Sequence, residues 1–297
     1  MGTAPANRDD IRDFLISRRA RLTPEQVGLP AGARRRVKGL RREEVAVLSG
    51  VSTEWYTRLE KGHISGVSED VLAAVARALQ LSDDERGYLF DLARAARPAR
   101  RTAARPREAV VDSPVQWLID SVTLSAVFLR NGRLDVVASN ALARALHAPL
   151  FASPTAAHHP PNFARFHFLD PVSRDFFVDW DGGAAATVAL LRAEAGRNPG
   201  DKALRELVGD LSTVSPEFRT LWASHDVRSR HEGVKRLQHP VVGYLELTYQ
   251  SADLANPARA ARSLNIYTAE PGTSHEQNLQ LLASWSAAPP AAERQVS

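Results

Sequence analysis

The stretch from Leu40 to Gly62 constrains the fold of this chain more than any other. Residues 41–49 carry apolar side chains at helical spacing, and Gly50 follows as a residue that can turn without Cβ strain. Ser52 is placed to cap a second helix, which Gly62 would end. Two short helices joined by a tight turn that contains glycine match the helix-turn-helix motif. We therefore predict such a motif here.

The outer face of the second predicted helix has the chemistry of DNA recognition. If Tyr56 and Leu59 point to the core, the threonine, glutamate and arginine side chains of the helix remain outside. These groups can hydrogen-bond base edges, and the arginine fork suits O6 and N7 of guanine. Arginines that open the first helix, together with helix amides, can hold phosphate. The predicted DNA-contacting residues are Arg41, Arg42, Ser52, Thr53, Glu54, Thr57 and Arg58.

Several features of this region have more than one interpretation. The motif could instead be an αα-hairpin of a helical domain with solvated arginines. Glu54 could accept from cytosine N4, repel wrong bases, or pair with Arg58 four residues further on. Trp55 either packs beside the turn or contacts DNA sugars and methyl groups. The basic run before the motif either contacts phosphate or is solvated surface, and it consists of Arg34, Arg35, Arg36 and Lys38.

Charge separates the two halves of the chain. Residues 1–106 hold 20 lysines and arginines against 14 acidic residues, whereas residues 107–297 hold 18 against 20. The positive charge therefore lies with the predicted motif, where attraction to polyphosphate would use it. The absence of cysteine excludes disulfides, thiol chemistry and cysteine metal sites. Neither a signal peptide nor a run of about 18 apolar residues is evident, so we expect a cytoplasmic protein without a membrane span.

The N-terminal part predicts a helical DNA-binding domain over residues 8–95. Further helices are expected from Asp9 or Asp10 to about Leu22, after Ser68 and after Ser82, which gives five helices with the two of the motif. Residues 96–112 are rich in alanine, arginine and proline and lack a hydrophobic period. We predict that they form a linker.

Residues 113–285 differ in character and predict an α+β domain, so that the whole chain is α plus α+β. The dipeptide Asn131-Gly132 favours a hairpin turn between predicted strands at 125–129 and 134–139. Later strands at 235–239, 244–250 and 263–268 would complete an antiparallel sheet of about five strands. Helices are expected at 114–122, 140–146, 170–180, 184–195, 201–211 and 215–222. Residues 286–297 are expected to be a disordered tail.

Quoted segments of both halves carry a resemblance to a known family. The segment RRRVKGLRREEVAVLSGVSTEWYTRLEKG resembles the start of the MmyB-like branch of the Xre-type bacterial regulators. The later segments VVASNALARAL, NFARFHFLDP, VDWDGGAAATVALLRAEAGRNPGD, SPEFRTLWASHDV, HPVVGYLELTY and LNIYTAEPGT follow in that family's order. The resemblance covers nearly the whole chain, from about Arg8 to about Trp285. It places the family's recognition helix on Ser52–Lys61.

The resemblance implies a homodimeric transcription regulator with a helix-turn-helix domain and a PAS-like ligand-sensing domain. A fatty-acid-like apolar ligand is a possibility that the family suggests. One departure concerns specificity, because repressors of the wider superfamily often begin the two helices with glutamine. This chain has Arg42 and Thr53 there, so a family base code cannot be transferred to it.

A ligand pocket is expected between sheet and helices of the second domain. For each aromatic candidate the pattern favours an ordinary core residue over a ligand contact, since Trp and Phe at helical spacing normally fill a core. The two arginine candidates lie among apolar residues and need a partner, either a carboxylate such as Asp170 or an acidic ligand. The candidates are Asn140, Arg165, Phe168, Trp180, Arg192, Phe218, Trp222, His225, His239 and Tyr267. His225 with Asp226 could also be a simple pair at a helix end.

Other classes of function find less support in the sequence. No nucleophile elbow, zinc-protease helix, Walker loop or Rossmann glycine pattern is present, so no catalysis and no cofactor are expected. His158 and His159 precede two prolines and read as a loop rather than a metal site. The alternative to a ligand sensor is a regulator whose C-terminal half binds a protein partner and no small molecule.

Overall fold

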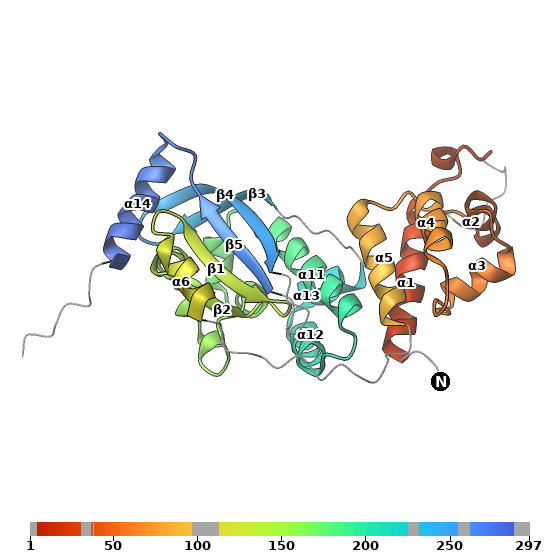
Figure 1. The fold of residues 1–297 in the computed structure, drawn as a ribbon, viewed down its shortest axis with the longest axis horizontal. Coiled ribbons are helices and arrows are strands. Elements are labelled where there is room, and N and C mark those ends of the chain that lie inside the picture. Colours follow the sequence, from red (N-terminus) through yellow and green to blue (C-terminus); the bar gives the residue numbers. More distant parts are fainter. Residues whose placement is uncertain are drawn as a thin grey trace, which may run out of the picture. The chain divides into compact units, whose positions relative to one another are not determined.

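The computed structural model describes residues 5–30, 37, 39–96, 113–224, 232–254 and 262–287 (Figure 1). Contacts divide the chain into two compact units. The helical unit contains residues 1–103, 189–208 and 220–229, and the sheet unit contains residues 104–188, 209–219 and 230–297. All but the first residue of the predicted linker, and all but the first two of the predicted tail, lie outside the described residues.

Five helices form the N-terminal part of the helical unit, as predicted. They are α1 (Pro5–Arg21), α2 (Arg42–Ser49), α3 (Thr53–Glu60), α4 (Glu69–Ala78) and α5 (Asp83–Ala95), with a short 3-10 helix η1 (Glu25–Val27) after α1. Serine caps explain where α3, α4 and α5 begin, because each hydroxyl accepts a hydrogen bond from a backbone amide three residues on. These caps are Ser52, Ser68 and Ser82.

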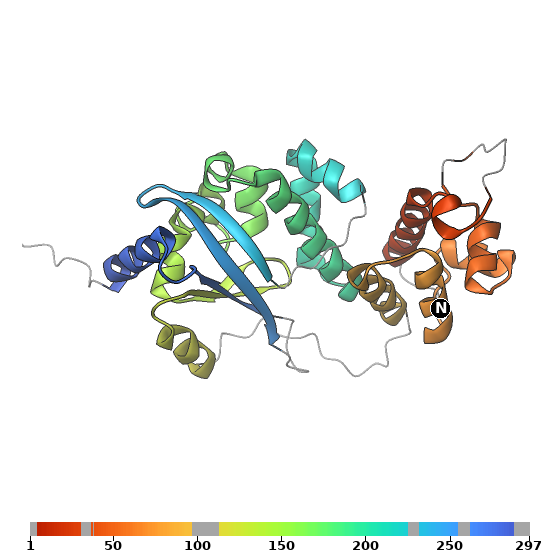
Figure 2. The same ribbon diagram turned by 90° about the horizontal axis from the view of Figure 1, so that it is seen from above.

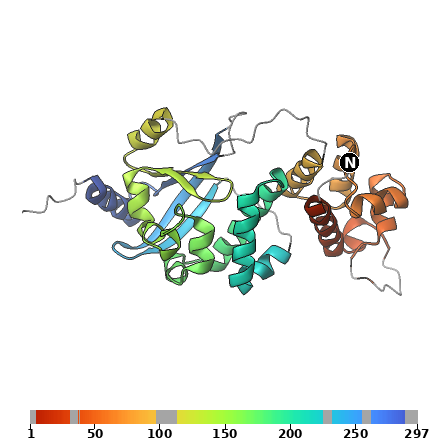
Figure 3. The ribbon, with the colours of Figure 1, turned by 90° about the horizontal axis from the view of Figure 1, so that it is seen from below.

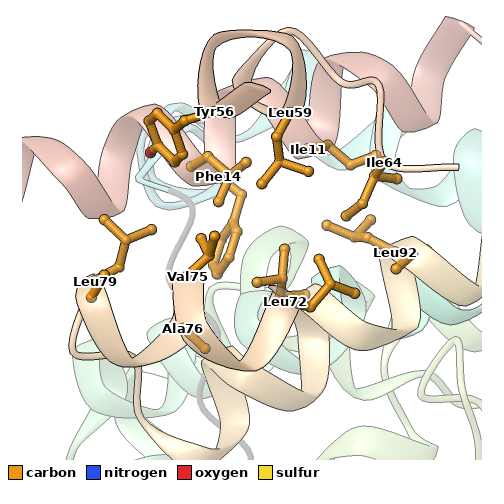
Figure 4. Close-up of a cluster of buried hydrophobic side chains, with 14 of the residues drawn as sticks. Ile11, Phe14, Tyr56, Leu59, Ile64, Leu72, Val75, Ala76, Leu79 and Leu92 are labelled. Atoms are coloured by element: carbon orange, nitrogen blue, oxygen red, sulfur yellow. The ribbon is translucent and has the colours of Figure 1, made fainter. Parts of the chain in front are cut away.

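The helices enclose one apolar core, shown in Figure 4. Tyr56 and Leu59 of α3 enter it beside Phe14 of α1, whose ring meets Tyr88 edge-on at 5.1 Å. Gly62 ends α3 with a φ of 87°, and a Cβ there would lie 2.7 Å from the carbonyl oxygen of Arg8. Only glycine fits both demands, which confirms it as the residue that ends the second helix of the motif.

The helical unit also contains segments from far along the chain. The boundary between the units falls within α11 (Trp180–Arg197), and parts of α12 (Lys202–Val214) and α13 (Pro216–Ala223) also belong to the helical unit. Ala193 lies in the helical core. A Cβ on Gly196 would lie 2.4 Å from the Tyr88 ring, so the backbone of α11 passes close to α5.

The sheet unit contains the expected five-stranded antiparallel sheet, in the order β2-β1-β5-β4-β3. Its strands are β1 (Ala126–Asn131), β2 (Val136–Ser139), β3 (Glu232–His239), β4 (Gly243–Leu254) and β5 (Arg262–Thr268). The predicted turn at Asn131-Gly132 joins β1 to β2, and the Asn131 side chain accepts hydrogen bonds from the Arg133 and Asp135 amides. Figure 2 shows the β3–β4 hairpin as a long curved ribbon in light blue.

Helices cover both faces of this sheet. The inner face packs on α7 (Ala141–Leu146), α9 (Phe163–Leu169), α10 (Val172–Phe176) and α14 (Ser274–Ala287) through a core that includes Phe128, Leu237 and Tyr267. The outer face packs on α6 (Ser113–Ser121) through Ile119 and Val127. Figures 2 and 3 show α6 and the green helices on opposite sides of the sheet. Two shorter helices, α8 (Ala148–Phe151) and η2 (Pro154–Ala156), connect α7 to α9.

The prediction of one helix through residues 170–180 is wrong. α10 ends at Phe176, Phe177 is extended and bridges to Leu237 of β3, and α11 starts at Trp180. The amide of Val178 donates to the Arg236 carbonyl at 3.2 Å, so pairing with a distant strand replaces the helical hydrogen bonds. The helices α8, α9 and α14 were not predicted.

Burial of His147 should make the sheet unit sensitive to acid. The ring is 2% exposed, and the rings of Phe128, Phe163 and Tyr267 lie 5.4–5.5 Å from it. Burial lowers the pKa of His147 from 6.5 to about 4. As the pH falls, His147 is protonated near pH 6.5 in the unfolded chain but only near pH 4 in the folded protein. The stability of the folded protein therefore falls as the pH drops from about 6.5 to about 4.

Replacing His147 by phenylalanine should flatten this dependence. The wild-type unfolding free energy is expected to fall by about 2 kcal/mol more than that of the variant between pH 7 and pH 5. Denaturant unfolding at both pH values, followed by near-ultraviolet circular dichroism, measures the difference. Burial also lowers the pKa of His167 to about 4. His167 therefore leaves some pH dependence of stability in both proteins. An unchanged pH dependence in the variant would contradict the assignment.

Candidate functional site

The exposed face of α3 is the centre of the candidate nucleic-acid interface. Tyr56 and Leu59 are buried, whereas Thr53, Glu54 and Arg58 are exposed and Thr57 is partly exposed. This is the division of faces that helical periodicity predicts. Arg58 makes no ion pair with Glu54 or with any other acidic residue that the structure describes. Its guanidinium is therefore available to a base edge or a phosphate, while DNA contact itself stays a prediction.

A hollow of about 350 Å³ lies beside this helix. Trp55 packs partly against the helical core and also lines the hollow, together with Arg58. The segment between α3 and α4 supplies the opposite wall. The lining residues are Trp55, Arg58, His63, Ser65, Gly66, Val67, Ser68 and Val71. The surface that α3 offers is thus grooved rather than flat.

A buried carboxylate, which the sequence analysis did not single out, holds α3 against its neighbours. Glu60 is 1% exposed and accepts hydrogen bonds from Arg19 Nε at 2.7 Å and from Arg42 Nε at 2.8 Å. Arg19 also donates to the Leu40 carbonyl at 2.6 Å. Burial raises the pKa of the adjacent Tyr56, and the nearby Glu60 charge raises it further, so the phenol stays protonated. The cluster joins α1, α2 and α3 at the base of the motif.

The two arginines predicted to hold phosphate differ in their surroundings. The Arg42 guanidinium is anchored by Glu60, yet 46% of the side chain is exposed, so it presents charge in a fixed position. Arg41 is the N-cap of α2, where its amide donates to the Glu44 carboxylate at 2.6 Å. Its side chain is 45% exposed and lies 3.4 Å from Glu43. The basic run at 34–38 lies outside the described residues, apart from Val37.

The residues predicted to line a ligand pocket do not converge on one place. Within the sheet unit, the Phe168 ring meets Phe218 at 5.0 Å and Trp180 at 5.8 Å. Arg165 forms an ion pair with Asp210, whose carboxylate lies 2.9 Å from the arginine Nη2. The partner suggested for it, Asp170, instead accepts from Ser153 Oγ at 2.6 Å.

Arg192 and Trp222 belong to the helical unit rather than to the sheet unit. Arg192 is 1% exposed, its guanidinium lies 4.2 Å from the centre of the Trp222 ring, and it donates to the Trp222 carbonyl. Burial raises the pKa of Asp10 in α1, and the Arg192 charge opposes that rise. Tyr88 of α5 faces the same guanidinium. This cluster joins α11 and α13 to the helices of the helix-turn-helix unit.

The remaining pocket candidates have structural partners of their own. Asn140 caps α7 and donates to the carbonyls of Val122 and Ser125. His239 Nε2 lies 3.0 Å from the Ala145 carbonyl, and its Nδ1 accepts from the Val241 and Val242 amides.

Tyr267 stacks on Phe128 at 5.7 Å in the inner core, and His225 lies outside the described residues. Ligand contact by any of the pocket candidates stays a prediction.

Two basic residues of the inner sheet face, Arg130 and Lys235, were not among the predicted site residues. The sequence places Arg130 next to a turn and Lys235 in a strand, and basic side chains at such positions are ordinarily solvated. Register and side-chain contacts place both over the aromatic core. No group of three or more His, Cys, Asp or Glu side chains suited to a metal ion occurs among the described residues.

Comparisons with known families agree with this arrangement. A family model described as the MmyB-like transcription regulator ligand binding domain matches residues 111–282. A helix-turn-helix domain model matches residues 17–89. No curated protein matches the chain. In the part of the chain that the structure describes, no helix has the length and apolar character needed to cross a bilayer.

Proposed function

The chain belongs to the MmyB-like transcription regulators, DNA-binding proteins with a ligand-binding domain, and from this premise we propose that it reads an inverted-repeat operator through α3. The observation that carries the proposal is the two-sided character of α3. Tyr56 and Leu59 anchor one side in the core, and the other side presents Thr53, Glu54 and an Arg58 that pairs with no acidic residue the structure describes. Arg41 and Arg42 would supply phosphate contacts, which position the helix in the groove.

The operator follows from the dimer that we propose. Two copies related by two-fold symmetry would place their α3 helices in successive major grooves, about 34 Å apart. Selection of bound fragments from random DNA with the purified protein should therefore yield inverted half-sites with centres about 10 base pairs apart. Sedimentation of the complex should show two protein chains per fragment. Enrichment of single, unpaired half-sites bound by one chain would refute the dimeric mode.

We also propose that a small apolar or fatty-acid-like ligand in the C-terminal domain modulates DNA binding. The aromatic inner core around Phe128 and Tyr267 supports this, as does the ligand-binding family model. Such a ligand can act only if it binds the DNA-competent and incompetent states with different affinity. Thermal unfolding of the full chain with medium-chain fatty acids tests the idea, and no shift with any of them would remove it. We also propose that the protein has no catalytic activity and that it is located in the cytoplasm.

A protein partner for the C-terminal half is the second candidate. Trp117 and Leu118 of α6 are 68% and 57% exposed. A hollow of about 390 Å³ lies on the same outer sheet face, lined by residues that include Ala252, Leu264 and Ile266. Exposed apolar surface of this kind favours a protein contact. If a Trp117→Ser, Leu118→Ser double variant kept ligand response and DNA binding but lost regulation in cells, this candidate would be preferred.

A further inference from the structure

Two basic side chains point onto the inner face of the sheet. Register pairs Ala126 of β1 with Tyr267, and residues alternate along a strand, so Arg130 lies on the same face as Ala126 and Phe128. Lys235 lies two residues from the buried Leu237 in β3 and therefore shares its face. Both side chains are only partly exposed.

Both cations lie near Tyr249, and Arg130 also lies near Tyr267. Lys235 Nζ lies 5.9 Å from the centre of the Tyr249 ring and 6.0 Å from that of Phe177. Tyr249 and Tyr267 are direct neighbours on β4 and β5, with ring centres 5.9 Å apart. Arg130 interacts electrostatically with both tyrosines. Burial lowers the pKa of Lys235, and the Arg130 charge lowers it further, so the cations are close enough to repel each other.

No carboxylate that the structure describes makes a direct contact with either cation. Among the described residues, neither Arg130 nor Lys235 takes part in a hydrogen bond from its side chain or in an ion pair. Asp253 attracts Arg130 and Asp179 attracts Lys235, but neither carboxylate forms an ion pair or a hydrogen bond with the cation. Asp253 instead accepts from Ser263 Oγ at 2.6 Å, and Asp179 accepts from the Gly182 amide at 3.0 Å. A cation that is partly withdrawn from water without a hydrogen bond or an ion pair is costly, which makes the pair unusual for a merely structural feature.

The histidines that face Lys235 and the phenol of Tyr267 are uncharged at pH 7. His147 and His167 face Lys235, and burial lowers the pKa of each to about 4, with the lysine charge lowering it further. Both rings are therefore neutral at pH 7. Burial raises the pKa of Tyr267, so its phenol stays protonated and can donate a hydrogen bond. The inner face thus combines two cations with phenolic donors and an aromatic wall.

We infer that Arg130 and Lys235 form the binding site for the anionic head group of the ligand, a carboxylate or a phosphate, whose apolar part lies against the aromatic core. This inference rests on the proposed ligand-sensing function and adds the charge that the ligand must carry. An anion between the two side chains would supply the direct ion pair that no described residue provides, and a planar guanidinium suits bidentate contact with either group.

Four ten-carbon probes, titrated into the full chain by calorimetry, test the inference: decanoate, decyl phosphate, decanol and decyltrimethylammonium. Both anionic probes should bind at least tenfold more tightly than decanol, and the cationic probe should bind most weakly. The tighter of the two anions identifies which head group the site prefers. Equal affinity for decanol and both anions would overturn the anion site while leaving an apolar ligand in place. Absence of binding by all four would instead overturn the ligand proposal itself.

Single substitutions test whether Arg130 and Lys235 bind the anionic head group specifically. Arg130→Met and Lys235→Met should each weaken binding of the anionic probes about tenfold and leave decanol binding unchanged. Arg236→Met is the matched control, because Arg236 adjoins Lys235 but lies on the opposite face, where it pairs with Glu246 at 2.8 Å. Without ligand, the two test variants should unfold at the wild-type temperature or above it. A marked loss of stability in Arg130→Met would show a structural role and overturn the inference for that residue.

Discussion

Replacing Glu60 by alanine should lower the unfolding free energy of the helical unit by about 3 kcal/mol. The substitution leaves Arg19 and Arg42 without the carboxylate that both contact, and breaking a buried pair typically costs about 3–5 kcal/mol. The expected loss is at the low end of this range because 46% of the Arg42 side chain is exposed, so water can solvate its guanidinium once the carboxylate is removed. Hydrogen exchange over α1, α2 and α3 in increasing denaturant reports this unit separately from the sheet.

The same helix provides a control for this result. Glu54 has the same charge as Glu60 and is exposed, so Glu54→Ala should change stability by no more than about 0.5 kcal/mol. Glu60→Gln removes the charge but keeps an oxygen acceptor, and it should fall between the two. Equal effects of Glu60→Ala and Glu54→Ala would show that the buried cluster does not hold the motif together.

Replacing Arg58 by alanine should weaken binding to the selected operator by about 1–3 kcal/mol and relax the preference at one base pair. The reason is that Arg58 is exposed on the outer face of α3 and has no acidic partner among the described residues. Titrations of operator and random DNA at several salt concentrations measure the specific and the non-specific parts separately.

Arg41→Ala is the informative comparison for Arg58. A phosphate contact carries no base preference, so this variant should weaken binding to all sequences alike and lower the salt slope by about one. Both variants should retain wild-type unfolding, since neither side chain is buried. A loss of affinity in Arg58→Ala that is equal on operator and random DNA would assign Arg58 to the backbone as well.

The fate of the arginines shows where prediction from the sequence stops. Periodicity correctly separated Arg58, on the outside of α3, from Tyr56 and Leu59, because that separation depends only on a helical repeat. It could not assign partners to Arg165 and Arg192, since Asp210 and Trp222 come from other helices.

The break in the predicted helix at Phe177 also depends on a segment that is distant in the sequence. Residues 170–180 have a plausible helical pattern, but pairing of Phe177 with Leu237 stops the helix. A local pattern contains no information about a strand sixty residues away in the chain. The same holds for α11, whose last turns belong to the helical unit although the sequence places them in the middle of the second half.

The sequence by itself determined the turn motif, the serine caps of α3, α4 and α5, the glycine that ends α3 and the five antiparallel strands. Each follows from contacts between near neighbours or from the repeat of a strand, so a short window contains the cause. Only the tertiary structure decided which charged side chains form ion pairs and which do not. Glu60 accepts from Arg19 and Arg42, which lie 41 and 18 residues earlier in the chain, whereas Arg130 and Lys235 form no ion pair with any described acidic residue. Such pairings depend on how distant segments pack, because the cost of a buried charge is set by what the folded chain brings within reach of it.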